Sequence, residues 1–102
     1  MTDTSTSLRR AIEAVLFTAP GERPLHPEFG TPLGRLMPGA VGEPEAAAVA
    51  WLARAALQRW LGDRILVEAL RVTPEPAALD VEVRYVRRAD GERERATFRL
   101  EA

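Results

Sequence analysis

Apolar residues recur at helical spacing in the first part of the chain. Positions three or four apart there carry Leu8, Ala11, Ile12, Val15 and Leu16. A helix with these residues on one face is predicted to begin near Ser7, whose hydroxyl can cap free backbone amides. It ends at Thr18, because Pro20 and Gly21 break the pattern. Residues 1–7 are predicted to form a flexible tail.

A second and longer apolar face lies between residues 44 and 61. It consists of Val49, Leu52, Ala53, Ala56, Leu57, Trp60 and Leu61. Pro44 suits the first position of a helix, and Glu45 complements the positive end of the helix dipole. Gly62 then ends the predicted helix.

The period of the apolar pattern changes to two in the last third of the chain. Residues 64–72 are apolar at both alternating positions, which predicts a strand with two apolar sides. Residues 78–86 and 96–102 alternate apolar and polar positions, which predicts strands with one buried face. The Asp90-Gly91 pair between them is a strong signal for a hairpin turn.

These elements predict one α+β domain over residues 8–102. Its two helices cover one face of a three-stranded antiparallel meander, and a chain of 102 residues suffices for one such core. The two outer strands of this sheet leave open edges. The last strand can accept a strand from a partner through Thr97 and Arg99. Alternatively, the charges of that strand only blunt the edge.

Charge and composition exclude several classes of function. The 14 basic residues, all arginine, stand against 15 acidic ones, and no tract of one sign is long enough for a nucleic-acid-binding arm. No apolar run is long enough to cross a bilayer, and the polar N-terminus does not resemble a signal peptide. We therefore expect no nucleic acid partner, no membrane insertion, and assembly in the cytoplasm.

The segment between the predicted helices, residues 16–36, combines four prolines and three glycines with the only histidine. Glu22 and Glu28 flank His26 there, where acid and base groups of an enzyme can lie. An open loop favours ordinary ionised carboxylates, and the chain has no nucleophile triad, phosphate-binding loop or second histidine. We therefore predict no catalytic residue, no cofactor and no metal, with His26 as a packed or solvated loop residue.

Trp51 lies on the helix face opposite Val49 and Leu52, among alanines. A tryptophan in such surroundings forms a flat apolar patch. Two interpretations are open: the long loop covers Trp51, or Trp51 belongs to an interaction surface.

The loop also carries a dense sequence pattern, LFT.PGER...PEFG..L..L. It is formed by Leu16, Phe17, Thr18, Pro20, Gly21, Glu22, Arg23, Pro27, Glu28, Phe29, Gly30, Leu33 and Leu36. With the helix ending ALQRW and the strand RILVEALRV, this pattern resembles the baseplate wedge family of contractile phage tails. That family includes the type VI secretion baseplate component once described as lysozyme-like. The resemblance spans nearly the whole chain.

The resemblance implies a structural protein in six copies around the tail tube. Each copy would join larger wedge subunits, and its sheet would offer strand pairing to sheath protein. The loop would be shaped for a neighbour, with its prolines and glycines lowering the entropy cost of one geometry. The loop residues assigned to this interface are Glu22, Arg23, Pro27, Glu28, Phe29 and Gly30. Phe29 and Leu33 are also candidates for the core.

Many members of the family carry Glu-Pro-Arg where this chain has Gly62, Asp63 and Arg64. The resemblance implies that Asp63 and Arg64 contact a wedge partner or brace the turn for it. The resemblance does not decide the type of particle, since phage tails, secretion systems and injection particles all use relatives of this protein.

Two other functions are left open by the sequence. A small muramidase would act through Glu22 or Glu28, as the older description of the family suggests. A free-standing adaptor domain would be unrelated to tails, and its gene would lack sheath, tube and wedge neighbours.

Overall fold

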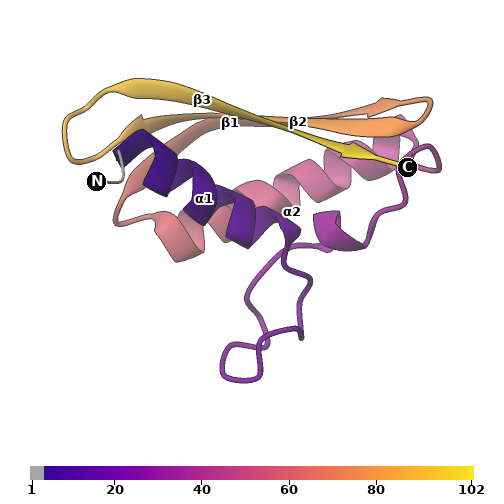
Figure 1. Cartoon of the computed structure of the whole chain (residues 1–102), viewed down its shortest axis with the longest axis horizontal. Helices are drawn as coiled ribbons and strands as arrows, with labels where there is room; N and C mark the ends of the chain where they lie inside the picture. Colours follow the sequence, from indigo (N-terminus) through magenta and orange to yellow (C-terminus); the bar gives the residue numbers. More distant parts are fainter. Residues whose placement is uncertain (1–3) are drawn as a thin grey trace.

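The computed structural model describes residues 4–102 as two helices packed on a three-stranded sheet. The elements are α1 (Thr4–Phe17), the 3-10 helix η1 (Pro32–Arg35), α2 (Glu43–Leu61), β1 (Ile65–Glu75), β2 (Ala78–Arg87) and β3 (Arg93–Glu101). The strands are antiparallel, in the order β1-β2-β3. Both helices lie under one face of the sheet, and the opposite face is uncovered (Figure 1). The predicted α+β arrangement is confirmed.

The core lies between the helices and the covered face of the sheet. Its fully buried side chains include Ile12, Leu16, Leu33, Leu57, Ile65, Leu79, Val81 and Val83. In β2 every second residue from Leu79 to Tyr85 is buried, as the alternating pattern predicted. The hairpin at Asp90-Gly91 is also confirmed, with Gly91 at a φ of 74°.

Strand β1 differs from the prediction of a strand with two apolar sides, because only one of its faces is covered. The pairing register shifts between Val67 and Ala69, where the strand has a β-bulge. Val67 pairs with Tyr85 before the bulge, and Leu70 pairs with Val83 after it. Side chains at odd-numbered positions therefore point to the core before the bulge, and those at even-numbered positions do so after it. The run of apolar residues therefore arises because the core-facing positions of β1 change at the bulge.

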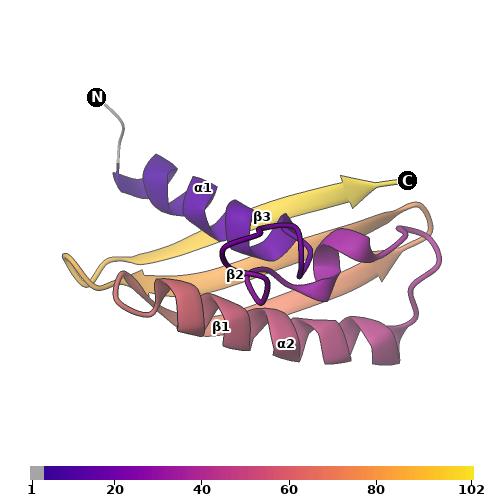
Figure 2. The ribbon, with the colours of Figure 1, turned by 90° about the horizontal axis from the view of Figure 1, so that it is seen from below.

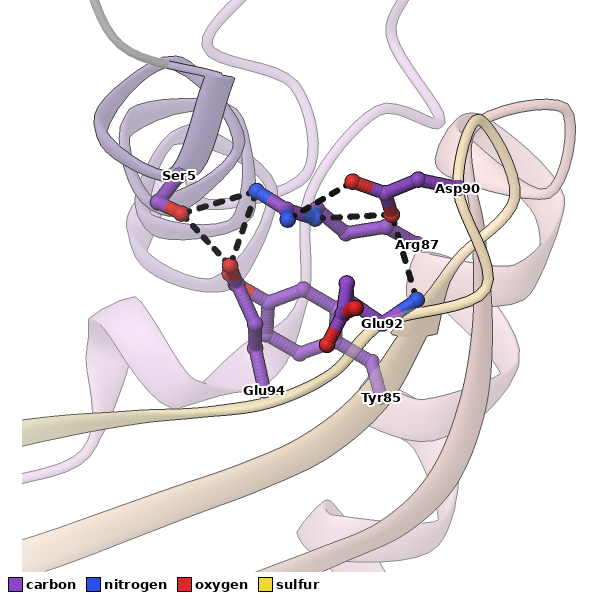
Figure 3. A network of polar contacts seen from close by, with 6 residues as sticks. All are labelled: Ser5, Tyr85, Arg87, Asp90, Glu92 and Glu94. Carbon is purple, nitrogen blue, oxygen red and sulfur yellow. Dashed lines mark hydrogen bonds and ion pairs between the residues drawn. The ribbon is translucent and has the colours of Figure 1, made fainter.

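Helix α1 begins at Thr4, three residues earlier than predicted. Four of the seven residues assigned to a flexible tail are therefore helical, and residues 1–3 lie outside the described part of the chain. The first turn is held from the side by the β2–β3 hairpin (Figure 3). Ser5 donates to Glu94 and accepts a hydrogen bond of 2.9 Å from Arg87. The periodicity of apolar residues does not predict these contacts, because polar side chains make them.

The same polar network continues into the hairpin. Arg87 lies 3.0 Å from a carboxylate oxygen of Glu94 and 2.8 Å from one of Asp90. The hydroxyl of Tyr85 donates to the other Glu94 oxygen at 2.8 Å. Burial raises the pKa of the Tyr85 phenol above its ordinary value, and the hydrogen bond to Glu94 raises it further. The network thus fixes the start of α1 on the end of the sheet (Figure 3).

Candidate partner interface

The segment between α1 and η1 forms a loop that projects from the body of the molecule (Figure 1). Its base is closed by Thr31, whose backbone N–H donates to the Thr18 carbonyl at 3.0 Å. The Thr31 hydroxyl donates to the Leu16 carbonyl at 2.7 Å and accepts from the Leu33 N–H at 3.1 Å. Thr31 is 1 % exposed, and it was not among the residues predicted to shape the loop. The available signal was a threonine directly before Pro32, because a capping residue followed by proline is a common start of a helical turn.

Gly30 and Phe29, both assigned to a partner surface, lie at this base and are buried. Gly30 has a φ of 111°, and a Cβ there would lie 1.9 Å from the Thr18 carbonyl oxygen. The Phe29 ring packs edge to face against Trp60, with ring centroids 5.1 Å apart. Phe29 and Leu33 both belong to the core, which was the alternative interpretation of these two residues. Their position gives them a role in shaping the loop.

The far part of the loop is exposed and includes Glu22, Arg23, Pro27 and Glu28. A hydrogen bond of 2.7 Å from Gly21 to the Pro27 carbonyl narrows this part of the loop into a compact turn. Glu28 pairs with Arg59 of α2 at 3.4 Å, so the loop is tied to the last turn of that helix. The four residues are therefore presented together on a constrained backbone.

His26 lies close by, exposed, with its ring 5.7 Å from the centroid of Trp60. It is a loop residue packed on one side and solvated on the other, in accord with the prediction. Leu25 beside it is 89 % exposed, which makes it the most exposed large apolar residue in the described chain.

Arg23 provides a prediction that separates assembly from folding. Its guanidinium lies over the Phe29 ring, 4.0 Å from the centroid, and forms no ion pair among residues 4–102. An exposed contact of this kind contributes about 0.5 to 1 kcal/mol. Arg23→Ala is therefore expected to lower the melting temperature only slightly. If Arg23 contacts a baseplate partner, as the family resemblance implies, the same substitution reduces the yield of sheathed particles on the order of tenfold.

Electron microscopy of the particles and thermal melting of the same variant check this expectation. Arg10→Ala is the matched control, since Arg10 is exposed on α1 and forms no ion pair within the described residues. Normal particle yield with Arg23→Ala would contradict the interface assignment. A large loss of thermal stability would instead place Arg23 in the fold.

Asp63 and Arg64 form the turn that joins α2 to β1, and both are exposed. The Arg64 N–H donates to the Leu61 carbonyl at 2.9 Å, and the Arg64 carbonyl accepts from Arg88 at the same distance. The Arg64 guanidinium lies 3.3 Å from the hydroxyl of Ser7. The turn is therefore braced by backbone contacts, while the charged groups remain accessible to a partner.

The two edges of the sheet differ in how their backbone groups are satisfied. On β1, the Gln58 amide accepts from the Val67 N–H at 2.9 Å and donates to the Ile65 carbonyl at 3.2 Å. Arg54 donates to the Val67 carbonyl at 3.2 Å. Pro74, near the other end of β1, has no N–H to donate. Helix α2 thus satisfies backbone groups at the start of the β1 edge, and a proline removes a donor near its end, so both ends of this edge are less open to strand addition.

The β3 edge is more open. Its Thr97 carbonyl accepts a hydrogen bond of 2.8 Å from Arg9 of α1, so the backbone of Thr97 points away from β2. Because backbone groups alternate between the two edges of a strand, those of Arg95 and Arg99 point outward as well. The Arg99 side chain pairs with Asp80 at 2.8 Å across the uncovered face of the sheet. The positive charge of Arg99 therefore lies over the uncovered face of the sheet, next to the β3 edge.

Trp51 is 75 % exposed, so the interpretation that the long loop covers it is wrong. The loop instead packs on the other end of α2, at Trp60. Trp51 borders a shallow groove of about 320 Å³ between α2 and β1, together with Ala47, Ala50 and Leu70. The apolar patch that the sequence predicted around Trp51 is therefore exposed on the surface.

Within residues 4–102, no helix is long and apolar enough to span a membrane. Over the same residues, no cluster of three or more histidine, cysteine, aspartate and glutamate side chains is arranged to hold a metal ion. The described chain is a small α+β unit with a projecting loop and one open strand edge. An open strand edge can bind an extended segment of a partner through main-chain hydrogen bonds.

Comparison with known proteins identifies the family. Residues 2–92 match the model of the baseplate wedge protein gp25, so the chain belongs to this family of structural baseplate components. The predicted resemblance to a contractile-tail baseplate wedge family is confirmed. No curated protein sequence matches the chain significantly.

Solved structures with the same fold include a "putative tail lysozyme" from Geobacter sulfurreducens, with a TM-score of 0.82 and 19 % sequence identity. That match covers 99 % of this chain and 93 % of the Geobacter chain. A chain in the postcontracted baseplate of pyocin R2 has a TM-score of 0.57 and 24 % identity, covering 100 % of this chain and 88 % of its own. At these identities the similarity establishes the fold.

Proposed function

We propose that this protein links the wedge subunits of a contractile, phage tail-like baseplate to the first ring of sheath protein. The observation that carries the proposal is the difference between the two sheet edges. Gln58 and Arg54 bind backbone groups at the start of the β1 edge and Pro74 lacks an N–H near its end, whereas β3 presents outward backbone groups with one removable contact, from Arg9. An edge of this kind binds an extended segment through main-chain hydrogen bonds.

The opposite, non-sheet side of the molecule is proposed to contact the larger wedge subunits. Its loop presents Glu22, Arg23, Pro27 and Glu28, and the α2–β1 turn presents Asp63 and Arg64. The contact between Glu28 and Arg59 joins the loop to the last turn of α2, which leads into the α2–β1 turn. In a baseplate of six such copies, assembled in the cytoplasm, each copy would bridge a wedge and a sheath subunit.

A structural role without catalysis fits the two loop carboxylates. A glycosidase needs a general acid whose pKa is raised by a buried environment. Glu22 and Glu28 are both exposed, and Glu28 is paired with Arg59. We therefore propose that neither carboxylate hydrolyses cell wall.

Thr97→Pro tests the link to sheath protein. Proline removes an outward N–H of β3 and leaves the hydrogen bonds between β2 and β3 in place, because Thr97 points away from β2. We expect purified baseplates of this variant to carry no sheath in electron micrographs, while the melting temperature of the isolated protein stays within a few degrees of normal. The test uses particles and isolated protein from one preparation.

Thr97→Val is the matched control, since it keeps the N–H and changes only a side chain on the uncovered face. It is expected to support sheaths of normal length. Full-length sheaths on Thr97→Pro baseplates, with the domain folded, would rule out strand addition at β3.

A further inference from the structure

A groove runs along the open edge of β3, with α1 as its other wall. Figure 2 shows α1 running beside and under this edge. Arg9 spans the groove and divides it into two hollows, since it lines both. The larger hollow, of about 330 Å³, is also lined by Glu13, Phe17, Thr97, Phe98, Arg99 and Leu100. The smaller, of about 180 Å³, is lined by Ser5, Thr6, Tyr85, Glu94, Arg95 and Ala96.

The two hollows differ in chemistry. In the larger one, Phe17 packs edge to face on Phe98 at a centroid distance of 5.6 Å, and Phe17 and Leu100 are only partly buried. In the smaller one, Ser5 and Glu94 are already engaged with each other. One hollow therefore offers apolar surface that is still accessible to water, and the other offers a polar surface.

A strand that pairs with β3 would lie above this groove. Its side chains alternate between the two faces of the sheet, so those on the helix side recur every second residue, roughly 7 Å apart. They stand opposite the helix-side residues of β3, which are Glu94, Ala96, Phe98 and Leu100. Two successive helix-side residues of the incoming strand would therefore enter the two hollows, on either side of Arg9.

We infer that the α1–β3 groove selects the incoming strand by its side chains, with an aliphatic or aromatic residue seated against Phe17, Phe98 and Leu100. This inference rests on the proposed strand addition at β3 and specifies the partner that fits there. Backbone pairing alone carries little sequence preference, whereas pockets for alternate side chains provide it. The neighbouring helix-side residue of the same strand is small or polar.

Arg9 must move when the strand arrives. Its guanidinium holds the Thr97 carbonyl at 2.8 Å and covers the Phe98 ring, 4.3 Å from the centroid. The first N–H of the incoming strand takes over that carbonyl, and the displaced guanidinium uncovers the ring for the apolar side chain. Before assembly, the same two contacts protect the edge against pairing with unrelated strands.

The first test compares Phe17→Gln with Phe17→Leu, using purified sheath protein of the same particle as the probe. Glutamine has about the volume of leucine, so the pair differs mainly in polarity. We expect Phe17→Gln to weaken sheath binding about tenfold or more, and Phe17→Leu to change it by no more than about twofold. Equal binding by both folded variants would overturn the inference.

The second test does not depend on Phe17 being tolerant of substitution. The chain has no cysteine, so Glu13→Cys places a single thiol on the exposed wall of the larger hollow. We expect bound sheath protein to slow labelling of this thiol about tenfold or more, whereas a thiol from Glu45→Cys on α2 labels at its free rate. Unchanged labelling of Glu13→Cys in the sheath complex would overturn the inference.

Thr97→Pro separates this inference from the function on which it rests. If Thr97→Pro still binds sheath protein, strand addition at β3 fails and the inference fails with it. If Thr97→Pro abolishes binding while Phe17→Gln binds normally and Glu13→Cys remains reactive in the complex, strand addition stands and only the selective groove is rejected.

Discussion

Gly30→Ala is expected to lower the free energy of unfolding by about 3 to 5 kcal/mol. Two costs combine at this position. The φ of 111° is one that residues with a Cβ rarely adopt, and the new Cβ would lie 1.9 Å from the Thr18 carbonyl oxygen. That oxygen belongs to backbone and accepts the hydrogen bond from Thr31 that closes the loop, so it cannot move without opening the base.

Gly21→Ala is the matched control for this variant. Gly21 also has a positive φ, of 93°, but a Cβ there would meet no atom within 4 Å. The substitution should therefore cost only the backbone strain, about 1 to 2 kcal/mol. Urea unfolding of both variants measures the difference. Equal losses would show that the steric contact with Thr18 contributes nothing and that strain explains both.

The sequence predicted the regular elements of this fold well, because each is defined by a local pattern. The helix over residues 44–61 and the Asp90-Gly91 hairpin both depend on signals within a few residues of each other. The bulge in β1 was not predicted. A single inserted residue changes which positions face the core, and the run from Ile65 to Val72 is apolar enough to hide the change.

The candidate interface was predicted in part. The sequence located the loop, but it grouped Phe29 and Gly30 with exposed residues. Phe29 packs on Trp60, which lies 31 residues further along the chain, and Gly30 lies against the backbone of Thr18. The sequence also did not predict that α2 satisfies backbone groups at the edge of β1. Gln58 reaches Ile65 and Val67 across a turn, and nothing in the composition of α2 distinguishes it from a solvated residue.

Thr31→Val is expected to destabilise the protein by about 2 to 4 kcal/mol, although the two side chains have nearly the same shape. The Thr31 hydroxyl satisfies the Leu16 carbonyl at the end of α1 and the Leu33 N–H at the start of η1. Valine leaves both groups without this partner in a position that is 1 % exposed. A buried backbone group without a partner costs about 1 to 3 kcal/mol.

Thr31→Ser separates the hydroxyl from the methyl group of the same residue. Serine keeps both hydrogen bonds and loses one buried methyl, which should cost about 1 kcal/mol. In urea unfolding, Thr31→Ser is therefore expected to be clearly more stable than Thr31→Val, and equal stability would contradict the role assigned to the hydroxyl. Since Thr31 holds the loop at its base, Thr31→Val should also speed amide exchange at Gly21, whose hydrogen bond to Pro27 closes the far part of the loop. Thr31→Ser should leave that exchange rate unchanged, because the base of the loop stays closed.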